Sequence, residues 1–99
     1  MLPPTPPQNQ PIVVYIFNMK IRYFAWIKDI TNKDDDIIDI NHPKTIQELK
    51  KYLENLYPEL KKHFLQDVLR FAVNQEYVSE NFNLKPIDEI AIFPPVSGG

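Results

Sequence analysis

A single helical pattern stands between two groups of strand patterns in this 99-residue chain. Thr45 and Glu48 have the spacing of a capping box, in which the threonine caps the helix and the glutamate reaches back. One apolar stripe at helical spacing then comprises Ile46, Leu49, Leu53 and Leu56. Pro58 is expected to end this helix near Leu56 or Tyr57, because a proline disfavours the helical conformation in the residue before it. A short further helical turn is predicted for residues 58–64.

Two strands are predicted before this helix. From Met19 to Trp26 the side chains alternate, with Met19, Ile21, Tyr23 and Ala25 on one face and Lys20, Arg22, Phe24 and Trp26 on the other. The second face begins charged and ends aromatic, which indicates that Phe24 is exposed at a partner surface. Trp26 is expected instead to pack under a loop or under the N-terminal apolar run, residues 12–17. A polar turn over residues 32–36 and the isoleucines Ile37, Ile38 and Ile40 predict a second strand that forms a hairpin with the first.

Three short strands are predicted after the helix. Leu69, Phe71 and Val73 alternate with more polar neighbours, a turn follows at residues 74–76, and Tyr77 and Val78 form a brief fourth strand. Residues 84–88 read as a loop. On the last strand Ile90 and Ile92 point inward, and Ala91 and Phe93 therefore point outward.

This order of strands around one main helix predicts a two-layer α+β domain. The β-grasp (ubiquitin-like) arrangement fits it in under 100 residues, as a mixed sheet whose last strand runs beside the first. We expect residues 19–93 to form this domain and residues 94–99 to project from it as an extended C-terminal tail. Residues 1–18 form a leader with five of the ten prolines and an apolar run, 12–17, that looks like a strand and suggests no function.

The tail is the most distinctive part of the chain. Gly98 and Gly99 are its only glycines. The preceding Pro94 and Pro95 favour an extended, stiff backbone. A tip without side chains can enter a narrow channel and present its terminal carboxylate there. The terminal glycines could also be a frayed end, and Ser-Gly-Gly could be a linker. Neither interpretation explains why a proline pair follows directly after a strand pattern.

Composition excludes several other functions. The chain has no cysteine for a disulfide, a thiolate nucleophile or a cysteine metal site. His42 and His63 are far apart and read as surface residues, and Asp34, Asp35 and Asp36 read as a solvated turn. A net charge of −2 gives no reason to expect nucleic acid, and no apolar run approaches the roughly 20 residues of a membrane span. Without a secretory signal pattern or a nucleotide-cradling glycine loop, we expect a cytoplasmic protein that binds no cofactor and is not an enzyme by itself.

The C-terminal carboxylate of Gly99 is the remaining reactive group. It is ionised at neutral pH and is a poor electrophile. Adenylation by a partner enzyme that uses ATP gives it a leaving group. A sulfur donor can then displace AMP and leave a thiocarboxylate, or an amine can take the acyl group, as in protein conjugation.

Three segments resemble the MoaD family of sulfur carriers, the small subunits of molybdopterin synthase. The tail Phe-Pro-Pro-Val-Ser-Gly-Gly, residues 93–99, is similar to the family's C-terminal signature. Residues 73–78 resemble its strand-turn-strand segment, and residues 19–25 its opening strand. The resemblance covers about residues 19–99, and only in pattern between residues 32 and 68.

This resemblance implies that an ATP-dependent adenylyltransferase activates Gly99, that a sulfur donor converts it to a thiocarboxylate, and that the tail then enters the large subunit of molybdopterin synthase. There the sulfur would be transferred to cyclic pyranopterin monophosphate. The large subunit dimer would carry one small subunit at each end, as a heterotetramer. The positions matching the family's docking patch are Phe24, Tyr77 and Phe93, followed by the tail residues Pro94, Pro95 and Val96.

Other functions fit the same sequence features. A carrier of the same fold can serve thiamine synthesis or tRNA thiolation, although the Phe-Pro-Pro segment before the tail disfavours this. A ubiquitin-like modifier would be joined to lysines through Gly99. A plain interaction domain would carry the tail without using it.

Overall fold

The computed structural model describes residues 18–38 and 41–95. In chain order its elements are β1 (Met19–Tyr23), α2 (Ile27–Thr31), β2 (Asp35–Ile38), α3 (Ile46–Leu56), α4 (Leu60–Leu65), β3 (Arg70–Val73), β4 (Glu76–Val78) and β5 (Glu89–Phe93). The strands form one sheet in the order β2-β1-β5-β3-β4. The central strands β1 and β5 pair in parallel and the other neighbours are antiparallel, so the predicted mixed β-grasp sheet is confirmed.

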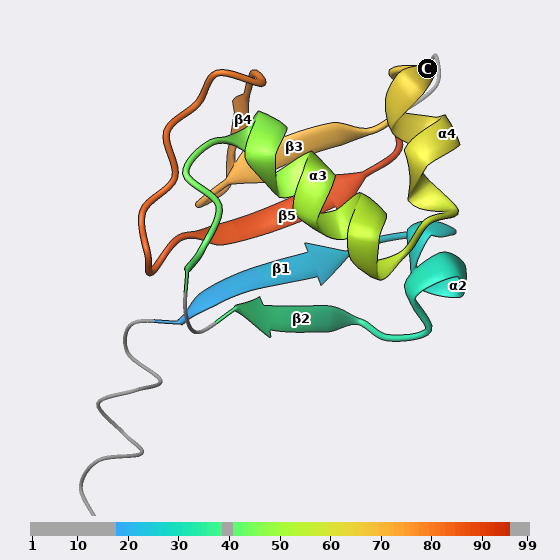
Figure 1. The fold of residues 1–99 in the computed structure, drawn as a ribbon, viewed down its shortest axis with the longest axis horizontal. Helices are drawn as coiled ribbons and strands as arrows, with labels where there is room; N and C mark the ends of the chain where they lie inside the picture. The colour runs from blue at the N-terminus through green and yellow to red at the C-terminus, as the bar shows by residue number, and fades with distance from the viewer. Residues whose placement is uncertain (1–17, 39–40, 96–99) are drawn as a thin grey trace, which may run out of the picture.

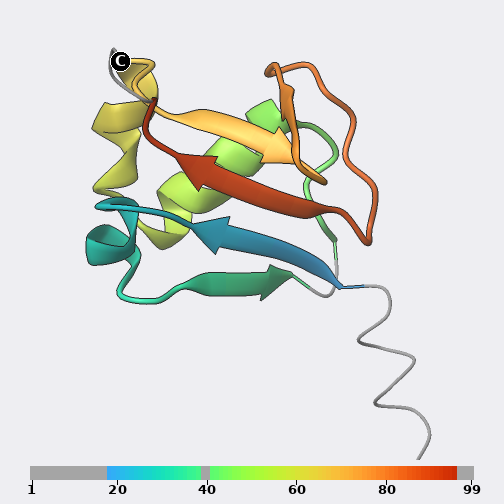
Figure 2. The same ribbon diagram turned by 180° about the vertical axis from the view of Figure 1, so that it is seen from behind.

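Helix α3 crosses one face of the sheet, and the other face is open (Figures 1 and 2). The inward side chains of β1 and β5, such as Ile21 and Ile90, are fully buried against Leu49 and Leu53 of α3 in one core. Each such side chain contributes about 1.5–3 kcal/mol when fully buried. Leu56, predicted to complete the helix stripe, is 48% exposed, because it lies at the end of α3 beyond the sheet-facing part of the stripe.

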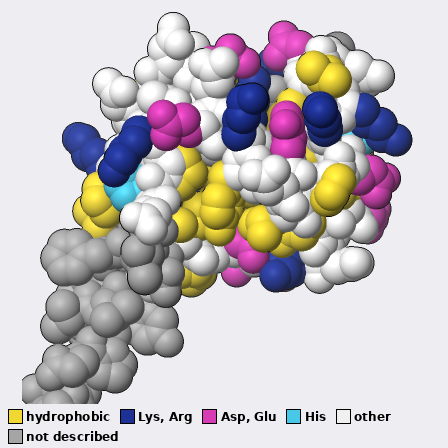
Figure 3. Space-filling model, viewed as in Figure 1, with side chains coloured by type: hydrophobic (Ala, Val, Ile, Leu, Met, Phe, Trp, Pro, Cys, Tyr) yellow, Lys and Arg dark blue, Asp and Glu magenta, His cyan; other side chains and the backbone are white. Residues whose placement is uncertain are grey.

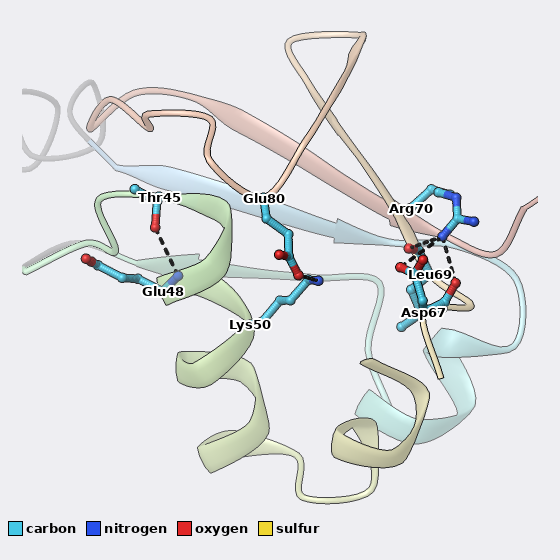
Figure 4. Close-up of polar contacts among 7 residues, drawn as sticks. All are labelled: Thr45, Glu48, Lys50, Asp67, Leu69, Arg70 and Glu80. Atoms are coloured by element: carbon cyan, nitrogen blue, oxygen red, sulfur yellow. Dashed lines mark hydrogen bonds and ion pairs between the residues drawn. The ribbon is translucent and has the colours of Figure 1, made fainter. Parts of the chain in front are cut away.

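The predicted cap of α3 is confirmed, with one difference (Figure 4). The Glu48 backbone N–H donates to Thr45 Oγ1 over 3.1 Å. The Glu48 side chain accepts from the backbone N–H of Lys44 over 2.9 Å, one residue before the cap. The helix ends at Leu56, as the following proline predicts. Lys50 on the same helix forms an ion pair with Glu80, which ties α3 to the segment after β4 (Figure 4).

The first strand is shorter than the alternation predicted. It ends at Tyr23, and Ala25 has a φ of 57°, which breaks the pleat and leaves Ala25 exposed instead of inward. The chain then forms α2, which was not predicted, so β1 and β2 are joined through a helix as well as a turn. Trp26 lies directly before α2 with its ring 4.8 Å from that of His63 on α4. Trp26 thus packs against α4 and stays 38% exposed, and the N-terminal run that was its other predicted cover lies outside the described residues.

The β3–β4 hairpin turns without a glycine. Asn74 and Gln75 both have positive φ, of 50° and 74°, which is the backbone of the tight turns that suit the twist of a hairpin. Asn74 also fixes this turn to the start of β5. The side-chain Nδ2 of Asn74 donates to Asp88 Oδ1 over 2.9 Å, and the side-chain Oδ1 accepts from the Glu89 backbone N–H over 3.0 Å. These bonds hold the β3–β4 hairpin, and with it Tyr77, in a defined position relative to β5, from which β4 is separated by β3.

Some predictions concern residues outside the described ranges. These are the strand over residues 12–17, the place of Ile40 in the second strand, and the tail residues Val96, Gly98 and Gly99. Among the described residues, no helix has both the length and the apolarity needed to cross a membrane.

Asp36 joins three elements through its carboxylate. It accepts from the hydroxyl of Tyr23 over 2.7 Å, from the hydroxyl of Tyr57 at the end of α3, and from Lys33 Nζ over 3.1 Å. Burial raises the pKa of Asp36, but the hydrogen bonds outweigh this and hold its pKa below the ordinary value. Burial of Tyr23 and its hydrogen bond to Asp36 raise the pKa of the Tyr23 hydroxyl. The hydroxyl therefore stays protonated and donates to Asp36.

Replacing Asp36 by Asn is expected to lower the free energy of unfolding by about 1–3 kcal/mol near neutral pH, because an amide cannot accept all of these bonds. The folded pKa is depressed, so the stabilisation is complete above the unfolded value of about 3.9 and is lost as the pH falls through the folded pKa. Urea titrations of both proteins near pH 7 and near pH 3 measure the difference. A difference that stays the same at both pH values contradicts the assigned role.

Candidate docking surface and tail

The open face of the sheet carries a cluster of aromatic side chains, which we call the aromatic patch: Phe24, Tyr77 and Phe93. Tyr77 is 80% exposed and Phe24 is 37% exposed. The rings of Tyr77 and Phe93 lie 5.5 Å apart with an angle of 34° between their planes. Together with Ala25, Pro94 and Pro95, the patch lines a shallow, mostly apolar depression of about 550 Å³. The structure thus brings together every predicted docking residue that it describes.

Strand pairing explains why residues so far apart in sequence meet here. Tyr23 pairs with Ile92, and the Phe24 backbone N–H donates to the Ile92 carbonyl over 3.1 Å, which places Phe24 beside Phe93. On the far side, Tyr77 pairs with the small Ala72. Because Ala72 has no long side chain, the Tyr77 ring can reach diagonally to Phe93 across β3. Side-chain alternation predicted which residues point outward, and pairing decided which of them touch.

This exposure indicates a function, because large aromatic side chains are usually buried unless they meet a partner. Charged side chains, including the ion pair of Arg22 and Glu89, border the patch on one side. An apolar centre with a polar rim is the usual composition of a protein–protein interface. The patch also borders Pro94 and Pro95, where the tail begins. A protein that docks on the patch is therefore next to the start of the tail.

A charged cluster lies beside the patch. Arg22 donates to Glu89 over 3.3 Å, and its guanidinium carbon lies 5.2 Å from the centre of the Phe24 ring. Lys20 lies 3.9 Å from Asp35 on β2. Alternation predicted that this face of β1 is charged at its start. No local pattern indicated that Arg22 would pair with Glu89, which lies on β5, far along the sequence.

The described residues contain no group of three or more His, Asp or Glu side chains arranged to hold a metal ion. His42 Nδ1 lies 2.7 Å from the Pro43 carbonyl oxygen, and His63 packs against Trp26. Both histidines were predicted to be surface residues, and both are half-buried. Each has a local packing or hydrogen-bonding role.

A β-grasp sheet with an apolar docking surface at the start of a C-terminal tail defines a ubiquitin-like carrier protein. Residues 21–99 match the ThiS family. The molybdopterin synthase sulfur carrier subunit of Dictyostelium discoideum is 41% identical over 83 residues, which are 81% of this chain and 94% of that protein. This chain belongs to the ThiS family.

Solved structures agree with this assignment. SAMP1 from Haloferax volcanii superimposes with a TM-score of 0.69 at 25% identity, covering 83% of this chain and 99% of the other. The complex of subunits 1 and 2 of the molybdopterin-converting factor from Helicobacter pylori contains a similar chain. That chain has a TM-score of 0.58 and 26% identity, with 83% of this chain and 99% of the other covered. The second structure is of a protein–protein complex.

Proposed function

We propose that this chain is the sulfur carrier subunit of molybdopterin synthase. The observation that carries the proposal is the exposed aromatic patch, which lies directly beside the start of the Gly-Gly tail. The relative from Dictyostelium discoideum, named for this function, and the Helicobacter pylori complex of two subunits support it. The docked partner in this proposal is the large subunit of the synthase.

The reactive group is the C-terminal carboxylate of Gly99. A partner adenylyltransferase joins it to the α-phosphate of ATP, and pyrophosphate leaves. A sulfur donor then attacks the acyl carbon, the bond to AMP breaks, and a thiocarboxylate remains. The tail carries this sulfur into the large subunit, where cyclic pyranopterin monophosphate receives it for its dithiolene.

The domain contributes position to this chemistry. The aromatic patch binds the partner, and Pro94 and Pro95, which line the same depression, stiffen the start of the tail. The four residues after Pro95 can span at most about 14 Å when extended, so the acceptor site lies within that distance of the docked patch. Gly98 and Gly99 let the tip pass through a narrow channel. ATP and the sulfur donor belong to the partner enzyme, and this chain acts in the cytoplasm without a cofactor of its own.

Intact-protein mass spectrometry tests the loading step. After incubation with the adenylyltransferase, ATP and a sulfide source, the chain should gain the mass expected for replacement of one oxygen by sulfur. Omitting ATP should prevent the gain. If the mass does not change while a control carrier is loaded by the same enzyme, the proposal is wrong. Adducts joined to lysines through Gly99 would instead indicate a protein modifier.

A further inference from the structure

The sheet has two edges, and one of them lies at the aromatic patch. The strand order places β2 at one edge and β4 at the other (Figure 2). An edge strand has backbone N–H and C=O groups that no neighbouring strand binds. Tyr77 of the aromatic patch is the middle residue of β4. This edge therefore presents backbone groups at the same place where the patch presents aromatic rings.

Strand register shows which way the backbone of Tyr77 faces. The turn between β3 and β4 has two residues, 74 and 75, so Val73 and Glu76 are the hydrogen-bonded pair that closes the hairpin. Hydrogen-bonded and non-hydrogen-bonded pairs alternate along antiparallel strands. The next pair, Ala72 and Tyr77, is therefore not hydrogen-bonded.

The pairing of β3 with β5 leads to the same result. The Asn74 backbone N–H donates to the Glu89 carbonyl over 2.8 Å. Two residues earlier on β3, Ala72 is paired with Ala91 and is again at a hydrogen-bonded position. The backbone groups of Ala72 are thus directed to β5, and those of Tyr77 are directed to the free edge. No other described residue binds the Tyr77 backbone.

The opposite edge carries more charge. Asp35 and Asp36 belong to β2, and Asp34 precedes them. Each of these three carboxylates forms an ion pair with a lysine. Charged side chains along an edge strand disfavour the addition of another strand. Since β4 has one charged residue, Glu76, beside the exposed Tyr77, its edge is the more open of the two to strand pairing.

A protein that docks on the aromatic patch meets the edge at β4. Tyr77 contributes its ring to the patch and its backbone to the edge. The face of the molecule that α3 covers instead shows acidic and basic side chains interspersed with one another (Figure 3). A partner that covers the Tyr77 ring from the open face can therefore place an extended segment along β4 without any change in this fold.

We propose that an extended segment of the large subunit adds to the sheet along β4 and forms hydrogen bonds with the backbone N–H and C=O of Tyr77. The inference rests on the proposed function, because it adds a backbone contact to the same docking surface. Strand addition to a sheet edge is a general mode of recognition, in which backbone bonds contribute affinity and side chains contribute specificity. Because β4 has only three residues, the contact is confined to the Tyr77 pair of bonds.

Tyr77→Pro, compared with Tyr77→Ala, tests the bond from the N–H. Both variants lose the ring, and only the proline variant also loses the backbone N–H. The free chain should tolerate the proline, since this N–H faces solvent on an edge strand. In calorimetry with the large subunit, Tyr77→Pro should bind about fivefold or more weakly than Tyr77→Ala, because a carbonyl of the partner is left buried without its donor.

Ile37 on β2 provides the matched control. The Tyr23 backbone N–H donates to the Asp34 carbonyl over 2.9 Å, so by the same alternation the Ile37 N–H is directed to the edge at β2. Ile37→Pro and Ile37→Ala should therefore bind the large subunit with equal affinity.

Hydrogen exchange of the wild-type chain gives an independent measurement, which decides the question if Tyr77→Pro does not fold. The Tyr77 amide should exchange about tenfold or more slowly in the complex than in the free chain, and the Ile37 amide should exchange equally fast in both. Equal affinities of Tyr77→Pro and Tyr77→Ala, or unchanged exchange at Tyr77, would refute strand addition and leave the proposed function intact. If the wild-type chain does not bind the large subunit at all, the proposed function is refuted together with this inference.

Discussion

Deleting Gly99, or replacing it by alanine, is expected to abolish molybdopterin formation while the folded domain remains intact. Deletion moves the carboxylate back by one residue, about 3.5 Å, so it no longer reaches the acceptor. Alanine places a methyl group beside the activated carbonyl, where a displacement of about 1 Å can cost about 100-fold in rate. The last buried core residue is Ile92 on β5, well before Gly99 in the chain, so neither change alters the core.

Reconstitution with the large subunit and loading enzymes measures this loss as the yield of molybdopterin. Ser97→Ala is the matched control, because it changes the tail but keeps both terminal glycines, and it should give nearly the wild-type yield. Thermal unfolding should be the same for all of these proteins. A normal yield from either Gly99 variant would refute the mechanism.

Replacing Tyr77 by alanine is expected to weaken the complex with the large subunit by about 30-fold or more. Tyrosine is a frequent hot spot, and truncation of such a residue typically costs about 2 kcal/mol or more, where each 1.4 kcal/mol is about tenfold. Because 80% of Tyr77 is exposed in the free chain, the stability of the domain should change little. The effect should therefore appear in the dissociation constant and not in the unfolding curve.

Leu65→Ala is the matched control for this experiment. Leu65 is 76% exposed on α4, so the variant also removes an exposed apolar side chain but leaves the aromatic patch complete. Phe93→Ala should weaken binding as well, and the double variant should lose less than the sum, because the two rings contact each other. Unchanged affinity of Tyr77→Ala in calorimetry would show that the partner binds elsewhere.

The elements with a regular apolar period could be predicted well. The cap at Thr45 and the stripe through Leu53 identify α3 because local spacing alone decides which side chains share a helix face. The same holds for Ile90 and Ile92, whose alternation placed Phe93 on the outer face. Helix α2 was missed because residues 27–31 form barely more than one turn, too short for a period to show.

Contacts between distant segments could be predicted only in part. The aromatic patch was expected from outward parity and from the family resemblance, and its members do come together. The Trp26–His63 packing and the Arg22–Glu89 pair were not expected. Strand register and helix docking decide such pairs, and neither leaves a local pattern.

The amino-acid sequence by itself determined the order of strands and main helix, the inward and outward faces of the strands and the Gly-Gly end, because each depends on neighbours a few residues apart. Only the tertiary structure decided that Ala72 and Ala91 lie side by side, in one row between Arg22 and Tyr77. The reason is physical: the parallel pairing of β1 with β5 joins segments about 70 residues apart, and its register follows from how the whole core packs.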